Sequence, residues 1–72
     1  MYRESFAKKL IKARKQTGLS QYEVAEETGI SRSTLASYET DRTQPDIETL
    51  GILADFYNVS TDWLIGTKGG NK

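Results

Sequence analysis

The 72-residue chain contains no cysteine and no histidine. Without cysteine, neither a disulfide framework nor a thiolate metal site is available. Without histidine, the chain lacks the usual imidazole ligand and the usual general base of catalysis. Its carboxylates are scattered over predicted helix faces, and its serine hydroxyls have no base to activate them. The sequence therefore predicts neither an enzyme nor a protein that binds a metal or a cofactor.

Long apolar runs are also missing, since no run exceeds three residues. A membrane-spanning helix needs about 20 apolar residues, and a signal peptide needs a continuous apolar segment. We therefore expect a cytoplasmic protein with no membrane partner. The length allows one domain with one small core, and no pocket for a small-molecule ligand is expected in so small a domain.

The formal net charge is zero, with 10 basic and 10 acidic residues. Phosphate contacts supply the sequence-independent part of DNA affinity and usually appear as a basic excess. The charges are unevenly distributed, because residues 1–45 hold eight Lys or Arg and six Asp or Glu, whereas residues 46–66 hold four acids and no base. The zero net charge therefore counts against a nucleic-acid partner, and the modestly basic N-terminal part softens that objection. Non-specific binding to nucleic acid is expected to be weaker than that of a basic regulator and to be sensitive to salt.

Apolar periodicity and capping residues predict five helices. They cover residues from near 2 or 5 to 16, then 21–28, 32–40, 47–57 and 61–65, and residues 67–72 form a flexible tail after a domain of residues 1–66. The predicted N-caps are Ser20, Ser31, Asp46 and Ser60. The fourth helix is expected to continue an apolar series of Ile47, Leu50, Leu53, Ala54 and Tyr57, whereas the first is expected to turn Lys8, Lys9, Lys12 and Lys15 to water.

The second and third predicted helices are hinged at Gly29, a spacing typical of a helix-turn-helix. The series Gln21-x-Glu23-Val24-Ala25-x3-Gly29-Ile30-Ser31-x3-Leu35-x2-Tyr38-Glu39, followed by Pro45, resembles the Cro/C1-type (XRE) family of phage repressors and bacterial regulators. The resemblance covers about residues 6–66. It implies an all-α, compact five-helix, lambda-repressor-like DNA-binding domain.

The resemblance also implies which residues read bases. The first turn of the recognition helix enters the major groove, and an arginine there can donate two parallel hydrogen bonds to guanine. Serine and threonine hydroxyls both donate and accept, so they discriminate less. The candidates for base readout are Arg32, Ser33, Thr34 and Ser37. The alternative is an ordinary exposed helix start, and for Thr34 a local capping bond.

Contacts to the DNA backbone are implied for Gln21, Ser31, Tyr38, Arg42, Thr43 and Gln44. Several of these have a second interpretation. Gln21 can brace the recognition helix, Ser31 can cap it, and Tyr38 can pack in the core. Asp41 stands where the family usually has glycine, and aspartate is one of the few residues that adopts a left-handed conformation at modest cost. Its negative charge lies beside the expected DNA surface.

Two further sets of residues follow from the resemblance. Arg14 and Glu39 are expected to form a largely buried ion pair that sets the recognition helix against the first helix. Trp63, Leu64 and Ile65 cannot all point inward from one short helix, so one of them is expected to contact a second copy of the chain.

The function implied is that of a sequence-specific DNA-binding transcriptional regulator, in the first place a repressor. A homodimer would place two recognition helices on a two-fold-symmetric, double-stranded operator with half-sites about 34 Å apart. The alternative is a protein-interaction module on the same scaffold, such as an antitoxin or a partner-regulated subunit. The zero net charge and the acidic segment 46–66 favour that alternative.

Overall fold

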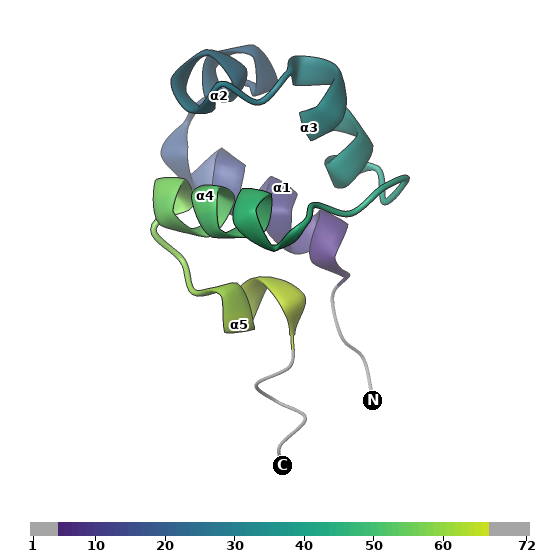
Figure 1. The fold of residues 1–72 in the computed structure, drawn as a ribbon. Coiled ribbons are helices and arrows are strands. Elements are labelled where there is room, and N and C mark those ends of the chain that lie inside the picture. Colours follow the sequence, from purple (N-terminus) through teal and green to yellow (C-terminus); the bar gives the residue numbers. More distant parts are fainter. Residues whose placement is uncertain (1–4, 67–72) are drawn as a thin grey trace.

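The computed structural model describes residues 5–66, which form five helices and no strands (Figure 1). These are α1 (Phe6–Thr17), α2 (Gln21–Thr28), α3 (Arg32–Glu39), α4 (Ile47–Tyr57) and α5 (Thr61–Ile65). The prediction of an all-α, five-helix domain is confirmed. The expected tail, residues 67–72, and the expected early start near residue 2 lie outside the described residues. In the described range, no helix is long and apolar enough to cross a membrane.

Each helix begins at a residue whose side chain accepts a hydrogen bond from the backbone N–H three positions on. These N-caps are Ser5, Ser20, Ser31, Asp46 and Ser60. At α2 the bond is reciprocal, because the Glu23 carboxylate also accepts from the Ser20 N–H at 2.8 Å. Such caps satisfy the otherwise unpaired N–H groups of the first turn and define where a helix starts. The four predicted caps are confirmed.

The turn after α3 depends on a left-handed aspartate. Asp41 has φ 63°, as predicted, and its backbone reverses the chain so that the Arg42 N–H donates to the Ser37 carbonyl at 2.9 Å. The helix ends at Glu39, one residue earlier than expected, because Thr40 has φ −107° and ψ 9° and forms the C-cap. The loop that follows starts from a defined position beside α3.

The five largest fully buried side chains of the core come one from each helix, in the order Leu10, Val24, Leu35, Leu53 and Leu64. Residues just before α2, α3 and α5 close it from outside, since Leu19, Ile30 and Val59 pack against this cluster. Hydrophobic residues before an N-cap commonly pack in this way onto the first turns of the helix. Each helix therefore contributes a large apolar anchor, and α1 and α4 add further buried residues along the same face.

Two expectations about solvent contact are wrong. Ile47 continues the apolar spacing of α4 but is 89% exposed. Its neighbours Asp46 and Glu48 are exposed as well, so the first turn of α4 lies outside the core. Lys9 does not simply face water, because its Nζ donates to the Trp63 carbonyl at 2.9 Å and lies 5.5 Å from the centre of the Trp63 ring. This lysine joins α1 to α5.

The Asp46 cap gives α4 a pH-dependent stability. The pKa of its carboxyl is lowered, first by the hydrogen bond from the Thr49 backbone N–H, which is 2.8 Å long. A lowered folded-state pKa stabilises the fold above the ordinary value of 3.8, and the contribution is lost as the pH falls through the folded-state pKa.

Asp46→Asn keeps a capping oxygen without the charge. We expect its melting temperature to be below wild type near neutral pH and equal to it in strong acid. Melting curves by circular dichroism across the acid range test this, and a difference that does not change with pH would contradict it.

The Tyr57 hydroxyl is the only buried side-chain polar atom in residues 5–66 without a hydrogen-bond partner. An unsatisfied buried hydroxyl costs about 1–3 kcal/mol, so Tyr57→Phe is expected to stabilise the domain by about 1 kcal/mol. Burial also raises the pKa of Tyr57 to about 12 from the ordinary 10.0. The wild type therefore loses stability as the pH rises through this range, because the unfolded chain releases the proton first, and Tyr57→Phe lacks that loss.

Urea titrations at neutral and alkaline pH measure both effects of Tyr57→Phe. The control is Tyr22→Phe, since the Tyr22 side chain is 65% exposed and its hydroxyl is not a buried unpaired atom. A destabilised Tyr57→Phe would show that the hydroxyl has a partner in solution.

Candidate nucleic-acid interface

The turn between α2 and α3 is held by short-range hydrogen bonds around Gly29. The Gly29 N–H donates to the Ala25 carbonyl at 2.9 Å. The Thr28 hydroxyl donates to the Val24 carbonyl at 2.8 Å and accepts from the Ile30 N–H at 3.2 Å. Gly29 has φ 80°, a conformation that glycine adopts without steric cost. The two helices therefore pack side by side at one end of the molecule, with a tight turn between them (Figure 1).

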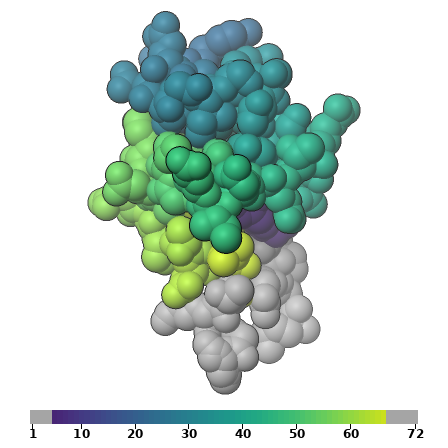
Figure 2. Space-filling view, viewed as in Figure 1, coloured from purple at the N-terminus to yellow at the C-terminus, as the bar shows by residue number. Residues whose placement is uncertain are grey.

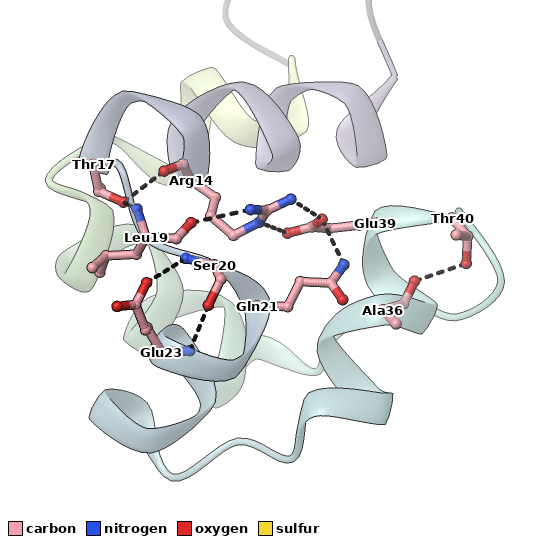
Figure 3. Close-up of polar contacts among 9 residues, drawn as sticks. All are labelled: Arg14, Thr17, Leu19, Ser20, Gln21, Glu23, Ala36, Glu39 and Thr40. Carbon is pink, nitrogen blue, oxygen red and sulfur yellow. Dashed lines mark hydrogen bonds and ion pairs between the residues drawn. The ribbon is translucent and has the colours of Figure 1, made fainter.

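A buried ion pair fixes the other end of α3 to the scaffold (Figure 3). Arg14 of α1 donates two bonds to Glu39, from Nε to Oε2 at 2.8 Å and from Nη2 to Oε1 at 3.0 Å. Its Nη1 donates to the Leu19 carbonyl at 3.1 Å. The pKa of Arg14 is raised, chiefly by the hydrogen bond to Glu39. The side chains are 16% and 3% exposed, so Glu39 is the more deeply buried partner.

Gln21 completes this network from α2. Its Nε2 donates to Glu39 Oε1 at 2.9 Å, so a single carboxylate joins three helices (Figure 3). Of the two interpretations offered for Gln21, the structure places its amide in the bracing role. The orientation of α3 relative to α1 and α2 is set by this hub, because bidentate charged hydrogen bonds are both strong and directional.

The first turn of α3 presents two of the candidate base readers to solvent. Arg32 and Ser33 are exposed. Thr34 is half-buried, and its hydroxyl accepts a bond from the Ser31 hydroxyl at 2.7 Å, while its N–H donates to the same Ser31 oxygen at 3.2 Å. Ser37 is half-buried one turn further on. Ser31 and Thr34 thus use their polar groups in local capping, and Arg32 and Ser33 are the more accessible pair.

An exposed tyrosine of α2 touches the recognition helix, and sequence reasoning did not single it out. The guanidinium carbon of Arg32 lies 4.8 Å from the centre of the Tyr22 ring. Tyr22 is 65% exposed. The signal available in the sequence was an aromatic residue directly after Gln21, in an otherwise polar helix start. Its spatial relation to Arg32 is a property of the turn between the helices.

The remaining backbone-contact candidates differ in accessibility. Arg42, Thr43 and Gln44 are exposed in the loop after α3, which projects from the side of the molecule in the space-filling view (Figure 2). Tyr38 instead belongs to the core and is 8% exposed. Its pKa is raised, first by burial and then by the charge of Asp46. The Tyr38 ring is therefore a packing residue, which is the second interpretation given for it, and contact of its hydroxyl with the DNA backbone stays a prediction.

The three candidates for a dimer contact also differ in their exposure to solvent. Leu64 is fully buried, so it is removed from the set. Trp63 is half-buried, and its ring is in contact with the Lys9 ammonium group. Ile65 is 48% exposed, and Ile52 of α4 is another exposed apolar side chain at 42%. Ile65 is the member of the predicted set that faces solvent most.

Two short helices joined by a tight turn, with the second held by a buried ion pair and presenting its first turn to solvent, define a helix-turn-helix DNA-binding domain. A model of the helix-turn-helix family HTH_3 matches residues 10–64. The chain therefore belongs to the Cro/C1-type helix-turn-helix family, and the resemblance inferred from its motif is confirmed.

Individual relatives are regulators of the same kind. The chain is 45% identical over 62 residues to the HTH-type transcriptional regulator ImmR of Bacillus subtilis (strain 168), a match that covers 86% of this chain and 49% of that protein. It is 38% identical over 60 residues to the SPbeta prophage-derived HTH-type transcriptional regulator YonR of the same organism, covering 83% and 56%. The chain spans about half the length of the curated relatives it matches.

A solved structure has the same arrangement of helices. The crystal structure of a transcriptional regulator from Listeria innocua aligns with a TM-score of 0.77 and 35% sequence identity, covering 90% of this chain and 61% of that chain. The all-α fold class is supported independently of the sequence motif.

Proposed function

We propose that the protein represses transcription by binding a specific operator in double-stranded DNA through the first turn of α3. The observation that carries the proposal is the exposed pair Arg32 and Ser33 on a helix whose far end is held at Glu39. A rigid recognition helix with free donors at its start suits the major groove. We infer that the protein acts on DNA in the cytoplasm. Its proposed activity is binding rather than catalysis, and the proposal includes no cofactor.

The proposal assigns roles to the other accessible candidates. Ser37 supports base readout from the second turn of α3. Thr34 supports base readout from the first turn, where its hydroxyl is held by the bond from Ser31. Arg42, Thr43 and Gln44 follow the sugar-phosphate backbone, and Arg42 is the strongest of these because a guanidinium matches phosphate geometry. Gln21 and Ser31 orient the helix. The Gln21 amide has a second N–H that can donate to a phosphate near a helix start, whereas the Ser31 hydroxyl can donate to a phosphate only in place of its bond to Thr34 Oγ1.

A homodimer completes the proposal. Ile65 is an exposed apolar residue on the last helix and is the proposed centre of the contact between two copies. Two-fold pairing would set two recognition helices on half-sites about 34 Å apart, which makes the operator a near-palindrome. An Ile65→Asp variant is expected to bind a single half-site as well as wild type and to lose the advantage of the paired site. Sedimentation of protein–DNA complexes measures the stoichiometry.

Selection from a randomised duplex library, at low and moderate salt, tests the DNA-binding function. Wild type is expected to enrich a two-fold-symmetric motif. The separate variants Arg32→Ala and Ser33→Ala are each expected to weaken the base preference at equivalent positions of the two half-sites. If no sequence is enriched even at low salt, the repressor proposal fails. The second candidate, a protein-interaction module, would then gain support from the exposed Ile47 and the acidic residues of α4 and α5.

A further inference from the structure

The contact between Tyr22 and Arg32 joins the starts of α2 and α3. Tyr22 is the second residue of α2 and Arg32 is the first of α3, and the two groups lie 4.8 Å apart as a cation–π pair. Both side chains are on the surface, where neither contributes to the buried cluster. The neighbouring Gln21 is anchored to Glu39, so the backbone that carries the tyrosine has a defined position relative to α3.

Stacking on a ring uses the face of a guanidinium and leaves its edge free. The five N–H donors of arginine lie in the plane of the group, and they are the donors that form paired bonds with the edge of guanine. A free arginine side chain samples many rotamers and loses that freedom on binding. An arginine already held against a ring loses less, which favours the complex that uses the held orientation.

We propose that Tyr22 is a positioning residue that holds the Arg32 guanidinium for paired hydrogen bonding to one guanine in each half-site. The inference rests on the proposed function, since it names how one of the proposed readers achieves its base preference. Tyr22 is not required to touch the base itself. Its contribution is confined to the base pair that Arg32 reads, and it depends on the aromatic ring rather than on the phenol hydroxyl.

The test uses duplexes of the selected operator and the same duplexes with the Arg32-contacted base pair changed to each alternative. Dissociation constants are measured for wild type, Tyr22→Ala, Tyr22→Phe, Arg32→Ala and the double variant Tyr22→Ala/Arg32→Ala. Cation–π contacts at exposed sites are weak, so Tyr22→Ala is expected to lower the preference for guanine by roughly 2- to 5-fold. Tyr22→Phe is expected to retain it, and Tyr22→Ala is expected to have no effect once Arg32 is absent.

A second measurement examines the stack without DNA. The ring current of Tyr22 should shift the NMR resonance of the Arg32 Nε–H, and the shift should disappear in Tyr22→Ala and remain in Tyr22→Phe. Absence of that shift in wild type would overturn the proposal. So would a Tyr22→Ala variant that weakens binding equally on all duplexes, which is the behaviour of a phosphate contact, or one that leaves guanine preference unchanged. If wild type selects no operator at all, the proposed function itself fails. If wild type selects an operator but Tyr22→Ala leaves the guanine preference unchanged, only the role of Tyr22 fails.

Discussion

Arg14→Met is expected to destabilise the domain by on the order of 3–5 kcal/mol, a large part of the stability of a small domain. The variant leaves the Glu39 carboxylate, which is 3% exposed, with Gln21 Nε2 as its remaining side-chain partner. A buried charge that has lost its counter-ion keeps its desolvation cost without the compensating attraction. Urea denaturation at neutral pH measures the change. The control Lys15→Met removes an exposed charge from the same helix turn and is expected to shift stability by about 0.5 kcal/mol or less.

The reverse truncation should cost less than Arg14→Met. In Glu39→Gln the arginine keeps its bond to the Leu19 carbonyl and is 16% exposed, so water can hydrate part of its charge. Replacing both partners by apolar residues, as in Arg14→Met/Glu39→Leu, is expected to recover much of the loss. The raised pKa of Arg14 stabilises the fold at every pH below its ordinary value, so the arginine itself adds no pH dependence to these differences between neutral and mildly alkaline pH. An Arg14→Met variant within about 1 kcal/mol of wild type would show that the hub does not hold the fold together.

Arg32→Ala is expected to reduce discrimination at one base pair of each half-site by about 1–3 kcal/mol. Arg42→Ala is the matched comparison, because it removes the same charge from the loop after α3 and leaves the first turn of α3 intact. It is expected to weaken binding to all sequences about equally and to lower the slope of log affinity against log salt by about 0.9. Fluorescence anisotropy on the operator and its single-base variants, over a range of salt, separates the two behaviours. Equal loss on every duplex for Arg32→Ala would place Arg32 on the phosphates instead.

Asp41 bears on the same surface, because it puts a negative charge next to Arg42. The left-handed turn explains why aspartate is tolerated there, since its φ of 63° is accessible to aspartate at modest cost. Its charge reduces the phosphate attraction that a glycine at this position would leave intact. Under the proposed function, the zero net charge of the chain and this local acid lead us to expect that affinity for DNA depends on a few well-placed donors more than on a broad basic surface.

The sequence by itself determined the helices and the starts of α2, α3, α4 and α5, and its resemblance to a known family supplied the class of fold. A cap such as Ser20 and its partner Glu23 lie three residues apart, and so do the other caps and the N–H groups they satisfy. Interactions of this range are readable from spacing, because the helix brings residues three and four apart together whatever the rest of the chain does. The pairing of Arg14 with Glu39 was accessible through family resemblance, since these residues are 25 positions apart.

Only the tertiary structure decided which equivalent-looking residues are buried and which are free. Spacing could not tell that Ile47 is exposed, that Leu64 rather than Ile65 fills the core, or that Lys9 reaches across 54 positions to Trp63. The position of Tyr22 against Arg32 was equally unpredictable. Each depends on how one helix is turned and placed against another, and that is set by the packing of five apolar anchors and the Glu39 hub together. Local periodicity describes the face of a helix, whereas the neighbours of that face are chosen by the whole fold.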